Sequence, residues 1–572
     1  MKPSNIEIAA LFEEMADLLE IDGANPFRVR AYRNAARTLM SMGREAYEIV
    51  EAGESLSNLP GIGKDLAGKI EEIIKTGSFA DLEQMRQKIP AGLRELLQIP
   101  GLGPKKIGLL YKELGITNST QLLEACKKGQ VRKLPGFGPK TEAKILKALQ
   151  AKLSEKRRFL LAEVEPYAQA LKDYLFKQEG VKQVVIAGSY RRRKETVGDL
   201  DILVTASAGS NPIEFFVNFR AIKEILAKGT TKASIVLHNN LQVDMRVIAK
   251  ESFGACLHYF TGSKAHNIAI RKLAQKKGFK INEYGVFKGK ERVAGESEES
   301  VFEILGLSYI PPELREDRGE IEAALSNSLP NLIKLEDLKG DLHLHTIYSD
   351  GISSIKEMAE EAKAMGLQYI AISDHSKRLR IANGLDASRL LQQIEEIDEV
   401  NSTITDFTVL KSIEVDILED GSLDLPDDVL EKLDLVVGAV HSRFNLPKEQ
   451  QTARILKAMD NPNLSILAHP TGRILLKREP YNVDVEAMIE KAKETGVALE
   501  LNANPNRLDL NDIYCRQAKE AGVKIAINSD AHSPNEIFNL LWGIGQARRG
   551  WLEPDDVINT LPVKKLLALF KR

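Results

Sequence analysis

The sequence predicts a multidomain protein made of a helical N-terminal third, an α+β middle domain and a C-terminal barrel of parallel strands. Three changes of pattern predict this order. Apolar residues follow helical spacing up to about residue 150, strand-like alternation begins near residue 181, and after residue 340 apolar runs alternate with helical segments. At 572 residues the chain is long enough for several domains, each with its own core.

The composition, with 43% hydrophobic and 28% charged residues, is typical of a globular protein. We see no apolar run long enough to span a membrane, and the first twenty residues predict an acidic amphipathic helix rather than a signal peptide. The three cysteines, Cys126, Cys256 and Cys515, lie far apart, which suits a reducing cytosol and argues against a cysteine-zinc site. We therefore expect a cytoplasmic protein without a membrane partner.

Charge is distributed unevenly along the chain. Residues 101–300 contain 36 Lys and Arg against 20 Asp and Glu, whereas residues 341–572 contain 27 against 37. The basic segment favours a polyanionic partner such as nucleic acid, although a solvated lysine-rich face would give the same count. The acidic part indicates either carboxylates gathered for a metal or an acidic surface.

A short motif occurs three times in the helical third: NLPGIGKDLAGKI (58–70), QIPGLGPKKIGLL (98–110) and KLPGFGPKTEAKIL (133–146). Each copy resembles the helix-hairpin-helix motif. Its glycines allow a tight turn and leave bare N–H groups beside a helix N-terminus, where a DNA phosphate can bind without sequence being read. The alternative is a plain packing element. The expected DNA-binding glycines are Gly61, Gly63, Gly101, Gly103, Gly136 and Gly138.

We divide this third into a helical domain over 1–90, which contains the first motif, and a helix-hairpin-helix domain over 91–150. The middle domain follows over 151–319. Its strands are expected at VKQVVIAGSY, DLDILVTA, SIVLHN and LQVDMRVIA, with helices near 211–228 and 264–277. A helix and a polar connector over 320–339 lead to the last domain.

Three aspartates are the candidate catalytic residues of the middle domain. On a strand, Asp199 and Asp201 point to the same face, and Asp244 lies on another alternating strand that could place it beside them. Carboxylates this close repel each other unless a cation lies between them. Hard oxygen ligands suit Mg²⁺, and two such ions can promote an in-line displacement on a phosphate. An exposed acidic strand is the plainer alternative.

The motifs GSYRRRKETVGDLD (188–201), VDMR (243–246), YFTGS (259–263) and KGFKINEYGVF (277–287) occur in one order along the chain. With the hairpin repeats, they resemble the family X DNA polymerases, the family of DNA polymerase beta, over about residues 1–319. The resemblance implies a nucleotidyltransferase core in which Asp199, Asp201 and Asp244 hold two Mg²⁺ or Mn²⁺ ions. It places Asp244 nearest the primer 3′-hydroxyl.

The same resemblance implies how the nucleotide is bound. Gly188, Ser189, Arg192 and Gly198 would bind the triphosphate. Tyr259 and Phe260, in a turn before Gly262, would lie against the sugar. Asn267 and Arg271 would contact the minor-groove side of the nascent base pair.

Three residues depart from the family pattern. Arg193 stands where the family often has glycine, Gln242 where it often has arginine, and Lys264 where an acid is frequent. Arg193 adds charge near the triphosphate, and Gln242 leaves the positioning of Asp244 open.

The first hairpin motif raises a second activity. Lys69 matches the Schiff-base lysine that removes 5′-deoxyribose phosphate in DNA polymerase beta, and Tyr32 also matches. However, Phe27 and Asp65 replace basic residues of that pocket. Because an aspartate keeps a lysine protonated, Lys69 is either a lyase nucleophile or simply a phosphate-binding residue.

After residue 340, seven βα units predict a distorted parallel (βα)7 barrel over 340–572. Six of the nine histidines of the chain occur there, at or near the ends of the predicted strands. Strand ends converge on one face of such a barrel, where active sites form. Mixed imidazole and carboxylate ligands suit Zn²⁺ or Mn²⁺, and nine of them suit a cluster of two or three ions. The candidate ligands are His343, His345, Asp350, His375, Glu414, His441, His469, Asp530 and His532.

The stretches HLHT, SDG, SDH, AHP and SDAH resemble the PHP (polymerase and histidinol phosphatase) domain, and all nine ligand positions of that domain are filled. The whole chain resembles the bacterial family X polymerases, which implies gap filling on DNA with a metal-dependent 3′–5′ exonuclease and raises the possibility of abasic-site cleavage. We expect primer-template or gapped DNA and dNTPs as partners, and a monomer at the nucleoid. Two alternatives stay open: hydrolysis of a small phosphate ester or pyrophosphate by the PHP domain, and a DNA-binding scaffold without turnover.

Overall fold

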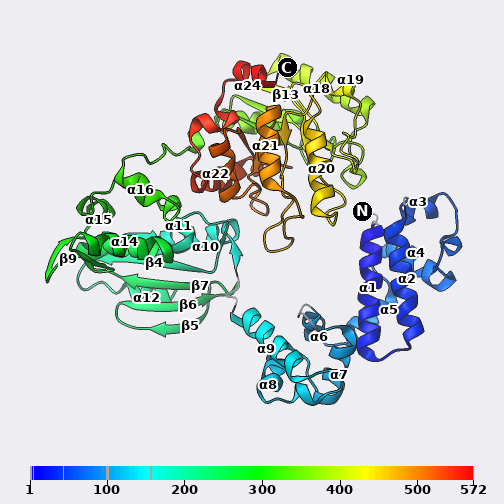
Figure 1. The fold of residues 1–572 in the computed structure, drawn as a ribbon, viewed down its shortest axis with the longest axis horizontal. Coiled ribbons are helices and arrows are strands. Elements are labelled where there is room, and N and C mark those ends of the chain that lie inside the picture. Colours follow the sequence, from blue (N-terminus) through cyan, green and yellow to red (C-terminus); the bar gives the residue numbers. More distant parts are fainter. Residues whose placement is uncertain are drawn as a thin grey trace. The chain divides into compact units, whose positions relative to one another are not determined.

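The computed structural model describes residue 3 and residues 5–42, 44–97, 99, 102–154 and 158–570. The chain divides into two compact units, Met1–Lys156 and Arg157–Arg572 (Figure 1). Within the described ranges, none of the helices combines the length and the apolar character needed to cross a membrane.

The first unit is helical throughout its described residues, as predicted. Phe12 on the first helix, Tyr32 on the second and Phe79 pack their rings edge to face or stacked, with centroids 5.4–6.2 Å apart, at the centre of its core. The helices are α1 (Asn5–Asp22), α2 (Pro26–Ser41), α3 (Ala46–Glu51), α4 (Lys64–Thr76), α5 (Ala80–Lys88), α6 (Ala91–Leu96), α7 (Pro104–Leu114), α8 (Ser119–Lys127) and α9 (Pro139–Ser154).

One turn recurs in all three hairpin motifs. A backbone N–H donates to the carbonyl three residues earlier over 3.0–3.1 Å, at Ile62, Leu102 and Phe137. Gly61 and Gly136 take φ values of +76° and +79°, a left-handed conformation that a side chain would strain. The equivalent Gly101 lies outside the described residues.

The second unit begins with a five-stranded sheet in the order β2-β4-β7-β6-β5, visible at the lower left of Figure 1. Its strands are β2 (Val181–Ile186), β4 (Asp199–Ala206), β5 (Ile222–Lys228), β6 (Lys232–Leu237) and β7 (Gln242–Val247). Helices α10 (Leu161–Phe176) and α12 (Pro212–Val217) pack against it. Strands β4 and β7 run parallel, and the other neighbouring pairs run antiparallel.

The prediction of a helix near 211–228 is wrong for the second half of this range. Residues Ile222–Lys228 form β5, which pairs with β6 at the edge of the sheet. The sequence IKEILAK carries no clear strand alternation, and six of its seven residues are exposed, so pairing with β6 decides its conformation rather than its own propensity.

A smaller helical and β region follows the sheet. It consists of α13 (Phe253–Thr261), α14 (Lys264–Lys276), β8 (Lys280–Asn282), β9 (Gly285–Lys288), β10 (Glu291–Ala294), α15 (Glu298–Ile304) and α16 (Glu320–Leu325). Helix α14 confirms the helix expected near 264–277. Glu298, the first residue of α15, is buried and pairs with Arg191 at 2.7 Å and with the buried Arg315.

The C-terminal part contains eight strands, one more than predicted, because the run TVLKSIEVD is split at Ser412 and Ile413. The strands are β11 (Gly340–Leu344), β12 (Tyr369–Ile372), β13 (Thr408–Lys411), β14 (Glu414–Asp416), β15 (Val437–Ala439), β16 (Ile466–Leu467), β17 (Ala498–Asn502) and β18 (Ile525–Asn528). They form two parallel sheets, β11-β12-β13 and β14 to β18 in order. Single parallel bridges, Leu344 to Ala531 and His375 to Glu414, join the two sheets.

Helices cover the outside of these strands. They are α17 (Ile355–Ala364), α18 (Ala387–Thr403), α19 (Asp427–Leu430), α20 (Lys448–Met459), α21 (Val485–Thr495), α22 (Asp512–Ala521), α23 (Leu540–Arg549) and α24 (Val563–Phe570). The buried faces of α17 to α23 supply one continuous apolar cluster with the strands, whereas Leu566 of α24 packs in a second cluster with Leu342, Ala371 and other strand residues. This outer layer of helices packs against the strands, whose C-terminal ends lie close together.

Candidate active sites

The three predicted aspartates of the middle domain lie on the two parallel strands β4 and β7. Asp201 and Asp244 are register partners across the ladder, and Asp199 is opposite Gln242. All three are half-buried. The sheet therefore brings the carboxylates together on one face, the arrangement expected from the alternation of Asp199 and Asp201.

Gly188 makes room for this cluster. Its φ is +66°, and a Cβ there would lie 2.9 Å from Oδ2 of Asp201. A side chain at this position would displace the carboxylate. Ser189 follows in the short helix α11 (Gly188–Arg191), and Gly198 directly precedes β4.

Asp244 is held by two neighbours. The Ser234 hydroxyl donates to its Oδ1, and Gln242 Nε2 donates to its Oδ2 over 3.0 Å. Gln242 therefore orients Asp244 directly, although the sequence left the positioning of Asp244 open.

The predicted triphosphate residue Arg192 lies in an ion pair. Its Nε is 2.9 Å from Glu316 Oε1, and its Nη1 donates to the Thr261 carbonyl over 2.7 Å. Its neighbour Arg193 has a φ of +54°, which explains why glycine suits this position in the family. The Arg193 guanidinium lies 3.3 Å from Glu165.

Tyr259 and Phe260 lie in the last turn of α13, not in a separate turn as expected, because the helix continues to Thr261 and Gly262 is its C-cap. Asn267 Nδ2 donates to the carbonyls of Tyr259 and Gly262 over 2.7 and 3.2 Å. Arg271 lies over the Tyr259 ring at 5.5 Å, and Lys264 begins α14. These two hydrogen bonds connect Asn267 on α14 to the C-terminal end of α13.

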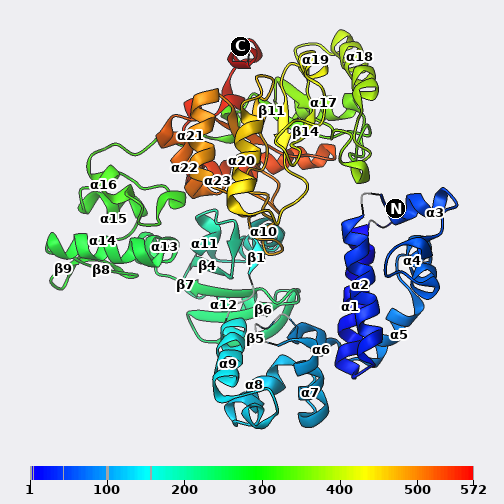
Figure 2. The ribbon, with the colours of Figure 1, turned by 45° about the vertical axis from the view of Figure 1, so that its right-hand side comes forward.

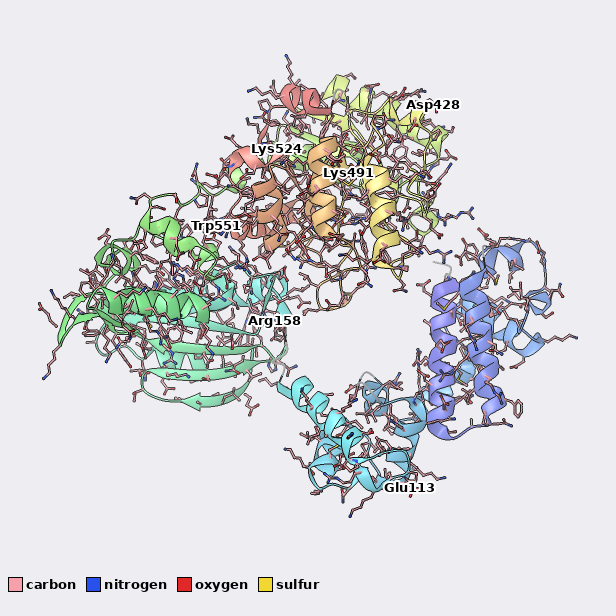
Figure 3. The ribbon with its side chains drawn as sticks, in the orientation of Figure 1. Glu113, Arg158, Asp428, Lys491, Lys524 and Trp551 are labelled. Carbon is pink, nitrogen blue, oxygen red and sulfur yellow. The ribbon has the colours of Figure 1, made fainter. Side chains whose placement is uncertain are left out.

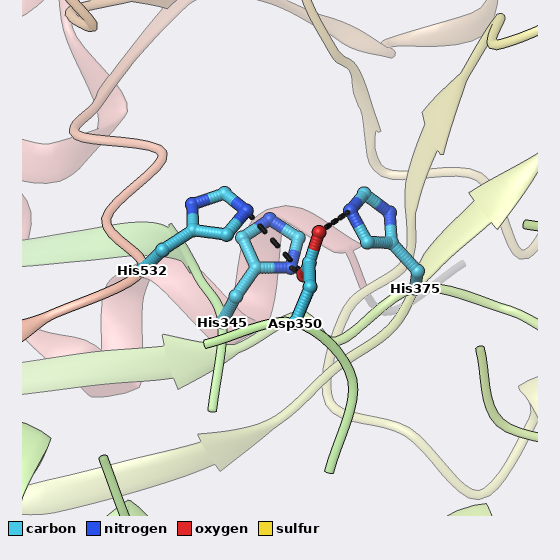
Figure 4. A group of neighbouring side chains, drawn as sticks. All are labelled: His345, Asp350, His375 and His532. Carbon is cyan, nitrogen blue, oxygen red and sulfur yellow. Dashed lines mark ion pairs between the residues drawn. The ribbon is translucent and has the colours of Figure 1, made fainter. Parts of the chain in front are cut away.

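The second site lies where the C-terminal strands end. Asp350 lies between two imidazoles, 3.5 Å from His375 Nε2 and 3.4 Å from His532 Nε2 (Figure 4). His345 completes this group, because its ligand atom lies within 4.8 Å of the others. Asp350 and His532 keep 35% and 32% of their side chains exposed, so the cluster opens to solvent on their side.

Glu414 joins the remaining ligands. Its carboxylate lies 2.6 Å from His375 Nδ1, 3.3 Å from His441 Nε2 and 3.0 Å from His469 Nε2. Asp530 approaches His345 Nε2 at 3.2 Å and His343 Nε2 at 3.8 Å. The fold therefore gathers all nine predicted residues in one cluster.

The donor set fits metal ions. Nε2 of His343 and both ring nitrogens of His345 are buried without a hydrogen-bond partner among the described residues. Such unpartnered nitrogens are costly unless another ligand occupies them. In each of three subsets every member has a ligand atom within 4.8 Å of the others, so each subset could hold an ion: His345 with Asp350, His375 and His532; His343 with His345 and Asp530; and His375 with Glu414 and His441.

Opposite charges shift the pKa values in this cluster. Burial lowers the pKa of His375 and His441, but the Glu414 carboxylate outweighs it and raises their pKa values to about 9 and about 10. Burial and two neighbouring imidazoles lower the pKa of His345 to about 3. In the metal-free cluster His375 and His441 are therefore imidazoliums beside Glu414, whereas His345 is neutral, and binding ions would displace protons from the charged rings.

Comparison with known proteins agrees with this architecture. Family matches are a helix-hairpin-helix domain (3–79), a SAM-like helix-hairpin-helix tandem (93–151), the DNA polymerase beta palm (158–271) and thumb (256–316), and the PHP domain (341–504). The DNA polymerase/3′-5′ exonuclease PolX of Bacillus subtilis is 41% identical over 99% of both chains. The chain belongs to the PolX family.

Two further relatives cover less of this PolX-family chain. A probable phosphatase of Thermoanaerobacter is 33% identical over 38% of this chain and 89% of its own length. A ternary primer/template complex of Leishmania infantum polymerase beta covers 39% of this chain and 98% of its own chain, with 23% identity and a TM-score of 0.27. As a PolX member the protein is a DNA polymerase with a 3′–5′ exonuclease, and its activities depend on metal ions.

The lysine matched to a lyase nucleophile is paired with acids in this PolX protein. Lys69 Nζ lies 2.6 Å from Asp65 and 3.5 Å from Asp81. Burial lowers the pKa of Lys69, but the hydrogen bond to Asp65 and the charges of both aspartates outweigh it and raise the pKa. Tyr32 is buried beside it, and Phe27 is 74% exposed. Lys69 is therefore a protonated amine at neutral pH.

Sequence reasoning missed the residues that support the PHP ligands. Buried Glu500 accepts from or donates to His343 Nδ1 through its Oε1 at 2.8 Å, depending on the protonation of the pair, and its Oε2 accepts the His469 N–H over 2.7 Å. Arg507 Nε lies 3.6 Å from Asp530 Oδ2. Glu500 could have been noticed as an acid inside the apolar strand VALELNA. Arg507 lies on a loop, where no sequence pattern marks it as part of the site.

Proposed function

We propose that this PolX protein fills short gaps in DNA during repair and trims DNA 3′-ends with its PHP domain. The observation that carries the proposal is that one chain holds two separate phosphate-chemistry sites. Three carboxylates lie together on β4 and β7, and nine metal-ligand side chains lie together at the PHP strand ends. Primer-template or gapped DNA, dNTPs and a monomeric protein at the nucleoid complete the proposal.

In the polymerase site Asp199, Asp201 and Asp244 would hold two Mg²⁺ or Mn²⁺ ions. When bound, such ions activate an attacking hydroxyl and stabilise a departing pyrophosphate. Gln242 and Ser234 keep Asp244 in one orientation. Arg192 would leave part of its contact with Glu316 to bind the triphosphate, and Gly188 leaves space beside Asp201.

In the PHP site the nine ligands would hold a cluster of two or three Mn²⁺ or Zn²⁺ ions. Such ions lower the pKa of a bound water and clamp a phosphodiester. Asp350 and His532 form the exposed side of the cluster, so a DNA 3′-end would approach there. Arg507, next to Asp530, adds a positive charge for a phosphate.

The hairpin turns would bind the DNA backbone. An added Cβ at Gly63, Gly103 or Gly138 would meet nothing within 4 Å, so the surface beside each helix N-terminus is open. Phosphates suit these positions because free backbone N–H groups and the helix dipole both favour an anion. The proposal also includes cleavage at abasic sites and lyase action by Lys69, which would require Lys69 to lose the proton that Asp65 and Asp81 stabilise.

A second candidate for the PHP domain is hydrolysis of a small phosphate ester or pyrophosphate. The identity of 33% to a probable phosphatase over this domain favours it. Rates of Mn²⁺-dependent hydrolysis on a 5′-labelled DNA primer and on 4-nitrophenyl phosphate would separate the two. We expect stepwise shortening of the primer with a far higher kcat/KM; efficient turnover of the ester with an intact primer would contradict the exonuclease proposal.

A further inference from the structure

The PHP domain contacts the loop that follows the predicted triphosphate-binding helix α11. Residues 192–195 connect α11 to β3 (Thr196–Val197), and three of the four meet the PHP domain. Arg549 donates to the Arg192 carbonyl over 2.9 Å, Arg473 pairs with Glu195 at 2.8 Å, and a Cβ on Gly545 would lie 3.2 Å from Cβ of Arg193. Figure 2 shows α23 directly above α11.

Two tryptophans of the PHP side anchor this contact in apolar clusters of the polymerase part. The only two tryptophans of the sequence, Trp542 and Trp551, lie in and just after α23. Trp542 packs against the apolar cluster of the five-stranded sheet. Trp551, labelled in Figure 3, packs against the cluster that contains Phe302 and Leu314. Arg549 therefore sits between two anchored side chains, with 2% of its own side chain exposed.

Arg549 and Arg192 share one carboxylate oxygen. Glu316 Oε1 lies 2.9 Å from Arg192 Nε and 3.0 Å from Arg549 Nη1. Burial raises the pKa of Glu316, but these two arginines, together with Lys194, outweigh it and keep the group ionised. The second amino group of Arg549 pairs with Asp512 at 2.7 Å.

The shared carboxylate matters when a triphosphate arrives. To bind it, Arg192 must give up part of its contact with Glu316. A buried carboxylate left without its partner is costly, and next to a polyanion it is also repelled. When Arg192 leaves Glu316, the ion pair between Arg549 and Glu316 remains. The free-energy cost of moving the Arg192 guanidinium to the phosphates is therefore lower.

We propose that Arg549 of the PHP domain is a positioning residue of the polymerase site, which compensates Glu316 and frees Arg192 for the triphosphate. The inference rests on the proposed role of Arg192. It means that the PHP domain contributes to nucleotide affinity in addition to carrying its own hydrolytic site.

The test measures single-nucleotide gap filling with Arg549→Met, with dNTP concentration varied. We expect KM for dNTP to rise about tenfold with kcat within about twofold. Arg548→Met is the matched control, because Arg548 is on the same helix and pairs across the same contact with Glu313 at 2.8 Å but does not touch the loop. It should leave KM unchanged.

The double variant Arg549→Met with Glu316→Gln distinguishes two roles of Arg549: compensation of the Glu316 charge, and packing between the two domains. Removing the carboxylate removes the need for its compensation, so the double variant should recover the wild-type KM. If Arg549→Met leaves KM unchanged, or if the double variant keeps the raised KM, the inference is wrong. Retained 3′-end hydrolysis would report that Arg549→Met is folded. Asp512 would not be left unpaired, because Arg318 lies 2.9 Å from it in this structure.

Two further variants complete the test. Should Arg549→Met fail to fold, Arg549→Gln takes its place, because it keeps a hydrogen-bond donor but removes the charge beside Glu316. It should raise KM by a similar factor, and a normal KM there would overturn the inference. Arg192→Met tests the proposed function itself. A normal KM in Arg192→Met would overturn the triphosphate role, whereas a raised KM there with a normal KM in Arg549→Met would overturn only the inference.

Discussion

The polymerase carboxylates and the PHP ligands are both proposed to hold metal ions, yet their surroundings differ sharply. Asp199, Asp201 and Asp244 are half-buried on an open sheet face, whereas His343, His345 and Glu414 are fully buried. In the first site few ligands come from the protein, so substrate phosphates must complete the ion shell. In the second the protein offers nine candidate ligand side chains, so it would supply most of the ion shell itself. Under the proposed function, the polymerase site would therefore gain its ions together with its substrate, whereas the ligands of the PHP site are already gathered.

Replacing Asp244 by Asn should give the largest effect. Loss of one of the three carboxylates proposed to hold the two ions should reduce primer extension roughly a thousandfold, since metal stabilisation of the transition state amounts to several kcal/mol. The measurement is single-nucleotide extension on gapped DNA. Hydrolysis of the primer 3′-end should stay at the wild-type rate, and near-normal extension would remove Asp244 from the site.

The reciprocal change replaces His343 and His345 by Asn together. Two ligands are lost from the buried cluster, so 3′-end hydrolysis should fall by a similar factor while extension is retained. Primer shortening without dNTPs measures it. Shortening at the wild-type rate would show that the buried cluster takes no part in DNA hydrolysis.

Glu500→Gln should give an intermediate effect. Because Glu500 orients the His343 ring, we expect Mn²⁺ affinity of the PHP site to fall about ten- to a hundredfold, with polymerase extension unchanged. Titration of exonuclease activity with Mn²⁺ reports the change. An unaltered Mn²⁺ dependence would mean that Glu500 serves only the packing of the strands.

The two sites should also respond differently to pH. The metal-free PHP imidazoles His375, His441 and His532 have pKa values raised to about 9, about 10 and about 9, so they are protonated at pH 7 and must lose protons to bind metal. Mn²⁺ affinity should therefore rise by at least about tenfold per pH unit between pH 6 and pH 8. Calorimetry in two buffers of different ionisation enthalpy checks this, and an absence of proton release would contradict it.

The smallest expected effect concerns Lys69. Removing one of its two acids in Asp65→Ala should lower its pKa and raise the fraction of free amine about threefold. Borohydride trapping on 5′-deoxyribose phosphate DNA should increase accordingly, with Lys69→Ala as the control. Trapping that persists in Lys69→Ala would show that another residue is the nucleophile.

Much of the architecture could be predicted from the sequence because its signals are local. The hairpin glycines, the alternation of Asp199 and Asp201, and the histidines at strand ends all follow from short-range pattern. The strand β5 could not, since pairing with β6 overrides an ambiguous local propensity. The split of the third PHP run into β13 and β14 was missed for a similar reason.

The supporting contacts of both sites were beyond the sequence because they join residues far apart in it. Glu500 meets His343 across 157 positions, and Arg549 meets Arg192 across 357. Acids in apolar strands and arginines at helix ends are common. The sequence pattern around Glu500 or Arg549 therefore does not indicate which distant residue it contacts. Only the fold shows which of them faces a site.

The most direct test of two active sites in one chain uses a 5′-labelled primer across a short gap, with Mn²⁺, with and without dNTPs. Products are resolved at single-nucleotide steps. The account predicts lengthening with dNTPs and stepwise shortening without them, the first lost in Asp244→Asn and the second in the double histidine variant. Lengthening without any shortening would contradict it and leave the PHP cluster to a small phosphate ester.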